Sequence, residues 1–165
     1  VIKNLSKMNN YRPCVGIMLI NSQHKVLIGK RLDSKVNETF AWQMPQGGID
    51  EGEDPETAAF RELSEEIGTN NARIICEYKK WLKYELPEEL RKTLWQGKYI
   101  GQSQKWFAMK FLGEDSEINI NTQNPEFIKW RWVKPEDLLS VVVPFKLEIY
   151  NELVKKLFPK ALKNF

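Results

Sequence analysis

The segment "RELSEEIG", residues 61–68, carries three glutamates, Glu62, Glu65 and Glu66, within little more than one helical turn. Side chains three and four residues apart are neighbours on a helix surface, where like charges repel by roughly 0.2–0.5 kcal/mol per pair. No lysine stands four residues after any of these glutamates to relieve the repulsion. Crowded carboxylates favour a hard divalent cation, which prefers oxygen ligands. The alternative interpretation is a solvated acidic face.

The residues around this segment predict one amphipathic helix with defined ends. Asp54 is a typical N-cap residue, Pro55 suits the first helical position, and Gly68 suits the left-handed position after the last turn. The helix is therefore expected from about Pro55 to Ile67, with the glutamates on one arc and Arg61 outside it. The adjoining apolar arc, expected to face the core, holds Ala59, Phe60, Leu63 and Ile67.

The rest of the chain predicts a mixed sheet and a second, C-terminal helix, which makes the fold class α/β (α+β). Strands are expected at residues 15–20, 25–31, 40–45, 73–86, 99–112 and 126–133. Loops or turns are expected at residues 21–25, 34–39 and 46–54, a single helical turn at 135–139, and the C-terminal helix at 144–158. His24, the only histidine, falls in a predicted turn, which argues against Ser-His or Cys-His nucleophilic catalysis.

Composition indicates one domain that handles anions. The chain has 165 residues, 42% of them hydrophobic, and a net charge of +3, which fits anion binding but does not by itself indicate nucleic acid. Cys14 and Cys76 lie in apolar stretches and are expected to be buried thiols in a reducing compartment. The start lacks a signal-peptide pattern, and apolar runs are too short to span a membrane. A cytoplasmic protein is expected.

Gly47, Glu53 and the segment 61–68 stand at the spacing G-x5-E-x7-R-E-U-x-E-E-x-G-U, where U is apolar. This spacing resembles the Nudix box, residues 47–69 here, and only Thr69 departs from it. The resemblance implies the Nudix fold, an α/β/α sandwich around a mixed β-sheet. It also implies a hydrolase that acts on nucleoside diphosphates linked to another moiety and uses Mg²⁺ or Mn²⁺. The domain is expected to span 10–155, after an N-terminal extension at 1–9 and before a helix end and tail at 156–165.

The flanking segments resemble one branch of that family. These segments are "YRPCVGIMLIN", "WQMPQGGIDEGE", "WLKYELP", "GQSQKWF" and "PEFIKWRWV". They are similar to the RNA pyrophosphohydrolase and dinucleoside polyphosphate hydrolase branch, also called the invasion protein A group, from about Tyr11 to about Tyr150. The resemblance implies removal of pyrophosphate from 5′-triphosphorylated RNA, which promotes mRNA decay, with no DNA or membrane partner. Hydrolysis of diadenosine tetraphosphate to ATP and AMP, removal of damaged nucleoside triphosphates and a non-catalytic nucleotide-binding module stay open as alternatives.

The resemblance also assigns roles to the acidic residues. Glu62 is the first choice for the general base and Glu126 the second, while Arg61 is expected to orient a glutamate. More than one metal ion is expected. Glu126 could instead be a surface residue. The implied metal site consists of Glu62, Glu65, Glu66, Glu126 and Gly47.

Substrate contacts are implied at Arg12, Arg31, Gln46, Tyr84, Phe145 and Lys146. Arg12 is expected at the 5′-phosphate, and Arg31 and Phe145 near the base, with Lys146 beside them. Alternatively, Phe145 anchors the last helix, and Arg31 and Lys146 are solvated surface.

The tryptophan and tyrosine side chains and the lysines near them could bind the bases and phosphates of a substrate. The rings are Trp81, Tyr84, Trp95, Trp106, Trp130 and Trp132, and most are expected in or near the core. One or two of them could line a base-stacking cleft. The run at residues 79–92 mixes lysines with rings, which fits either a phosphate-binding surface or a solvated loop.

Overall fold

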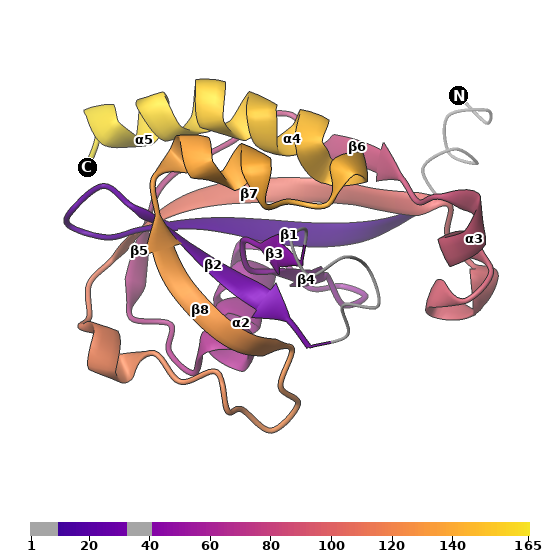
Figure 1. Ribbon diagram of the computed structural model, residues 1–165, viewed down its shortest axis with the longest axis horizontal. Helices are drawn as coiled ribbons and strands as arrows, with labels where there is room; N and C mark the ends of the chain where they lie inside the picture. The colour runs from indigo at the N-terminus through magenta and orange to yellow at the C-terminus, as the bar shows by residue number, and fades with distance from the viewer. Residues whose placement is uncertain (1–9, 33–40) are drawn as a thin grey trace.

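The computed structural model describes residues 10–32 and 41–165. The expected N-terminal extension, the predicted loop at 34–39 and Phe40 of the third predicted strand lie outside these residues. The described residues form one mixed, eight-stranded sheet with helices on both faces (Figure 1). Its strands are β1 (Tyr11–Ile20), β2 (Val26–Arg31), β3 (Trp42–Gln43), β4 (Gln46–Gly48), β5 (Ala72–Glu77), β6 (Leu82–Glu85), β7 (Gly101–Phe111) and β8 (Phe127–Val133).

The sheet is built around the parallel pair β1 and β7. Tyr11 lies opposite Gly101 and Ile20 opposite Lys110, so the two strands pair over the whole length of β1. The strand order is β3-β2-β1-β7-β5, with β4 beside β1, β6 beside β7 and β8 beside β2. All of these other pairs are antiparallel. The mixed sheet predicted from the sequence is confirmed.

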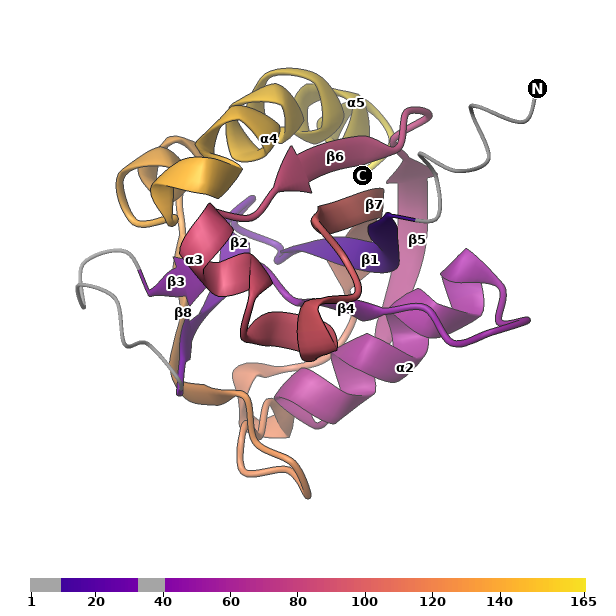
Figure 2. The ribbon, with the colours of Figure 1, turned by 90° about the vertical axis from the view of Figure 1, so that its right-hand side faces the viewer.

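Two apolar layers cover the two faces of the sheet. Side chains alternate along a strand, so Val15 and Ile17 face one side while Met18 and Ile20 face the other. Helix α2 (Pro55–Ile67) packs on the first face. A C-terminal helix packs on the second face and runs along it (Figures 1 and 2). This helix consists of α4 (Leu147–Glu152), the π-helical η6 (Leu153–Leu157) and α5 (Phe158–Lys163). The expected α/β/α sandwich is confirmed.

The ends of α2 are those predicted from its capping residues. The Asp54 side chain accepts hydrogen bonds from the backbone N–H groups of Glu56 and Thr57, and Gly68 has a φ of 74°. The buried arc differs from the prediction, because Phe60 is only partly buried while Ala58 is fully buried. The helix is therefore rotated so that part of the glutamate arc faces the protein interior.

The structure corrects several other predicted boundaries. Residues 46–54 are not loop throughout, because β4 pairs with β1. The long strand predicted at 73–86 is two strands separated at 78–81, each paired with a different part of β7. The C-terminal helix continues past residue 158, and its π turn ends two residues before Pro159, which cannot donate an i→i−4 hydrogen bond.

Short helical segments make up several connections. They are α3 (Glu88–Arg91), η2 (Leu94–Gly97), η3 (Asp115–Glu117), η4 (Pro135–Ser140) and η5 (Pro144–Lys146). Cys14 and Cys76 are free thiols, the first buried and the second partly buried. Within residues 10–32 and 41–165, no helix has the length and apolar character needed to cross a membrane.

Candidate active site

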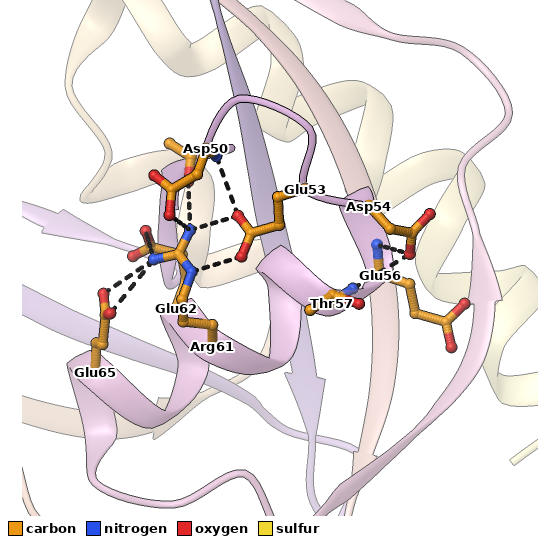
Figure 3. A network of polar contacts seen from close by, with 9 residues as sticks. Asp50, Glu53, Asp54, Glu56, Thr57, Arg61, Glu62 and Glu65 are labelled. Carbon is orange, nitrogen blue, oxygen red and sulfur yellow. Dashed lines mark hydrogen bonds and ion pairs between the residues drawn. The ribbon is translucent and has the colours of Figure 1, made fainter.

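Arg61 ties the glycine-rich loop to the glutamates of α2 (Figure 3). Its Nε and Nη2 each donate to the carboxylate of Glu53 at 2.8 Å, and Nη2 also donates to the carbonyl of Gly48 at 2.8 Å. Its Nη1 donates to Glu62 at 2.9 Å and to Glu65 at 3.2 Å. The planar guanidinium has five N–H donors, so one side chain can hold all four partners. Glu65, which has no lysine four residues after it, thus pairs with Arg61 four residues before it.

This network affects neighbouring carboxylates in opposite ways. Hydrogen bonds from Arg61, together with the backbone N–H of Asp50, lower the pKa of Glu53 to about 2. Burial raises the pKa of Glu62 to about 7, although Arg61 acts against that rise. Glu53 is therefore a permanently charged brace for the loop. Glu62 titrates close to neutral pH, as a general base requires.

Glu66 is the most deeply buried carboxylate of the helix, with 1% of its surface exposed. Its Oε2 accepts a hydrogen bond from the backbone N–H of Gln46 at 3.2 Å, whereas its Oε1 is buried without a partner among the described residues. Burial raises the pKa of Glu66 well above its ordinary value, and the charges of Glu126 and Glu62 add to the rise. Three carboxylates from two parts of the chain therefore converge at this point.

Glu126 reaches the site from the segment before β8, where its carbonyl accepts a hydrogen bond from Leu32 at 2.8 Å. Gly47 lies on the other side, on β4, against the carboxylate of Glu62. A methyl group at Gly47 would overlap that carboxylate, so only glycine leaves Glu62 in its place.

Glu62 and Glu66 each have a property expected of a ligand for a divalent cation. A buried carboxylate oxygen without a hydrogen bond carries a large free-energy cost, which an oxygen-seeking cation removes. Burial, which raises the pKa of both Glu62 and Glu66, disfavours their charged forms, and a nearby cation would favour them. Glu65 is more exposed and contacts Arg61. In the part of the chain that the structure describes, no three acidic, histidine or cysteine side chains form a ready ligand group.

A second cluster lies on the face of the sheet covered by the C-terminal helix. The Nζ of Lys146 donates to Gln43 at 3.1 Å and lies 5.7 Å from the ring centroid of Tyr84, which is 5.5 Å from that of Phe145. Lys146 is 4% exposed, so the alternative that it is solvated surface is wrong. Phe145 packs at the edge of the core cluster, where it also contributes to anchoring the helix. Gln43 was not predicted.

A relay of amides ends at the predicted residue Gln46, whose backbone N–H joins it to Glu66, while Gln102 and Gln104 were missed by sequence reasoning. The indole Nε1 of Trp106 donates to Gln104 Oε1 at 3.0 Å, and Gln104 Nε2 donates to Gln46 at 3.2 Å and Gln102 at 2.9 Å. Because an indole N–H can only donate, it fixes the direction of the whole relay. Gln102 therefore keeps its own NH₂ group for another acceptor, while the side chain of Gln46 hydrogen-bonds to Tyr84 and acts against the rise in the pKa of Tyr84. Polar residues at alternate positions of a buried strand, 102 and 104, were the available signal.

The two arginines predicted to bind substrate, Arg12 and Arg31, have different neighbours. The Arg12 guanidinium lies 5.1 Å from the ring centroid of Trp95, beside Gly48, and its Nη1 is 3.8 Å from the sulfur of Cys14. Burial raises the pKa of Tyr84, and the charge of Arg31 acts against this rise. The charge of Arg31 thus acts on the Tyr84 cluster, while Arg12 lies next to the glycine-rich loop.

Comparison with known proteins identifies the family of the chain. The family model described as "NUDIX domain" matches residues 10–154. An RNA pyrophosphohydrolase of Rhodospirillum rubrum is 56% identical over 147 residues, 89% of this chain and 87% of that protein. One of Wolbachia pipientis is 51% identical over 153 residues, 92% of each chain.

Solved structures resemble the chain in fold. The E. coli dihydroneopterin triphosphate pyrophosphohydrolase matches with a TM-score of 0.68 at 20% identity, over 88% of this chain and 97% of that one. A C. elegans Ap4A hydrolase complex matches with a TM-score of 0.66 at 22% identity, over 92% and 99%.

Proposed function

The chain belongs to the Nudix family, enzymes that act on phosphoanhydrides, and on that premise we propose that it removes pyrophosphate from the 5′-triphosphate end of RNA. The product is RNA with a 5′-monophosphate, and we place the activity in cytoplasmic mRNA decay. The observation that carries the proposal is the convergence of Glu62, Glu66 and Glu126 beside Gly47. It occurs in a chain about half identical to RNA pyrophosphohydrolases over most of its length.

Nudix hydrolases generally use divalent metal ions, and we assign more than one Mg²⁺ or Mn²⁺ to Glu62, Glu65, Glu66 and Glu126. When bound, such ions neutralise polyphosphate oxygens and make water a better nucleophile. No DNA or membrane partner is part of the proposal.

Glu62 takes the proton of the attacking water in this proposal, and Glu126 is the second choice. Burial, which raises the pKa of Glu62, favours uptake of a proton by its carboxylate. Arg61 donates a hydrogen bond to one oxygen of Glu62 and so holds the carboxylate in place. The oxygen of the water bonds to phosphorus, the α–β phosphoanhydride bond breaks, and pyrophosphate leaves.

The remaining side chains bind the substrate. Arg12 beside the glycine-rich loop supplies a cation for the 5′-phosphates, and Lys146 supplies another from the Tyr84 cluster. The rings of Tyr84 and Phe145 offer flat surfaces to a base, and we assign the side chain of Gln46, which hydrogen-bonds to Tyr84, to the substrate as well. Arg31, whose charge acts on the same cluster, is assigned to the base.

Diadenosine tetraphosphate is the second candidate substrate, because it also presents a flat base and a polyphosphate to these groups. A side-by-side assay decides between the two. Purified protein with Mg²⁺ is given triphosphorylated RNA or diadenosine tetraphosphate, and pyrophosphate or ATP is quantified. We expect pyrophosphate release from RNA that stops when the metal is chelated. Cleavage of the dinucleotide with negligible pyrophosphate release would reject the RNA assignment, and cleavage of neither would favour a non-catalytic module.

A further inference from the structure

A groove of about 660 Å³ lies at the end of the parallel pair β1 and β7. Pro13 and Ser103 form its floor, at strand positions that alternate with those of Arg12 and Gln102. Because side chains alternate between the faces of a sheet, the groove opens on the opposite face from the amide relay. It is therefore separate from the Tyr84 cluster, and no carboxylate of α2 is among the described residues that line it.

Three rings and two lysines line this groove. The Nζ of Lys83 lies 5.2 Å from the ring centroid of Tyr11, and the Nζ of Lys98 lies 5.3 Å from that of Tyr99. Trp81 completes the set, and 43% of its surface is exposed, which is unusual for so large a ring. No acidic residue is among the described residues that line the groove.

Among the described residues, the carboxylate of Glu85 contacts the groove residue Tyr11 and is already paired with a cation. Glu85 accepts a hydrogen bond from the hydroxyl of Tyr11 at 3.1 Å, and Arg91 pairs with it at 3.0 Å. The two lysine charges of the groove are therefore available to an anion, and the rings to a flat apolar group.

A line of contacts joins the groove to the loop of the candidate active site. The rings of Tyr99 and Trp95 pack edge to face, with 6.2 Å between their centroids. The guanidinium of Arg12 lies over the Trp95 ring, 5.1 Å from its centroid. Trp95 and the following residue, Gln96, have φ values of 48° and 58°. Bulky residues rarely adopt this left-handed conformation, so surrounding contacts must hold Trp95 between Arg12 and the groove.

Flat apolar surfaces alternating with cations match one class of ligand. Single-stranded nucleic acid presents unstacked bases to rings and phosphates to lysines, whereas the bases of a duplex are already stacked. We propose that this groove binds the single-stranded stretch of RNA that follows the 5′ end. The inference rests on the proposed function for its substrate. A strand held by Arg12 at its 5′ end would continue past Trp95 and Tyr99 into the groove.

Direct binding tests the groove without catalysis. The probe is a 3′-labelled, 12-nucleotide single-stranded RNA with a 5′-hydroxyl, and its Kd is measured by fluorescence anisotropy with the full chain. Trp81→Ala is expected to weaken binding about five- to hundredfold, as the loss of one stacked base implies. Lys98→Gln is expected to reduce the dependence of Kd on salt by about one counterion. The matched control is Ile128→Ala on β8, with 44% exposure, which should leave the Kd unchanged.

The RNA-binding and pyrophosphate-release measurements test this inference and the proposed function separately. A Kd that is the same in Trp81→Ala and the unmodified protein, or an unmodified protein that does not bind the probe, would overturn the groove. Equal weakening of heparin binding in Trp81→Ala would also overturn it, since heparin has charge but no bases to stack. Absence of pyrophosphate release from triphosphorylated RNA bears on the proposed function alone. Circular dichroism melting checks that each variant is folded.

Discussion

Replacing Arg61 by lysine tests the central network of the site. The change keeps the positive charge and removes the fork that holds several partners at once. In the variant, Glu53 still accepts a hydrogen bond from the backbone N–H of Asp50. The loss of hydrogen bonds therefore falls mainly on the Gly48 carbonyl and on Glu62. Both bonds, at 2.8 and 2.9 Å, involve a charged donor.

Each hydrogen bond to a charged group stabilises a fold by about 1.5–3 kcal/mol, and a lysine ammonium can keep one of these two. The expected net loss is therefore about 1.5–3 kcal/mol. For a domain of this size, that loss lowers the Tm by roughly 3–12 °C. Release of the Glu62 carboxylate from its fixed position is expected to reduce kcat by about ten- to a hundredfold.

Thermal unfolding and pyrophosphate release measure the two effects. Arg73→Lys, at an exposed position of β5, is the matched control and should change stability by no more than about 0.5 kcal/mol. If Arg61→Lys keeps a Tm within about 2 °C and a turnover within about twofold of the unmodified protein, the bracing role argued from the geometry is refuted.

Three further variants probe the same region. Glu66→Gln should lose more than about a hundredfold in turnover at saturating Mg²⁺, whereas exposed Glu56→Gln should not; wild-type turnover in the former rejects the metal scheme. Because burial disfavours the charged form of Glu66, the Tm of that variant should hold or rise. Gly47→Ala places a methyl group on a helix carboxylate and should reduce kcat by about a hundredfold; unimpaired kinetics would contradict the steric argument. Tyr150→Phe leaves the buried N–H of Met44 without its 2.8 Å acceptor, which should cost about 1–3 kcal/mol and be visible as a lower Tm. An unchanged Tm would show that this hydrogen bond contributes nothing.

The sequence by itself determined those features that depend on near neighbours along the chain. The ends of α2 follow from Asp54, Pro55 and Gly68, because capping interactions involve residues within one turn. The spacing of the Nudix box identified the family for the same reason, since its residues share one loop and one helix. Alternation and apolar runs placed most strands and the C-terminal helix, although several of their ends were wrong.

Only the tertiary structure decided how distant segments meet. The split between β5 and β6 depends on which part of β7 each one pairs with, and this pairing leaves no local pattern. Burial of Glu62 and Glu66 depends on the rotation of α2 against the sheet, and it is this burial that raises their pKa values. The amide relay and the aromatic groove likewise join residues tens of positions apart. Contacts of that kind form when packing closes the chain on itself, so the types of residue were readable in advance but their partners were not.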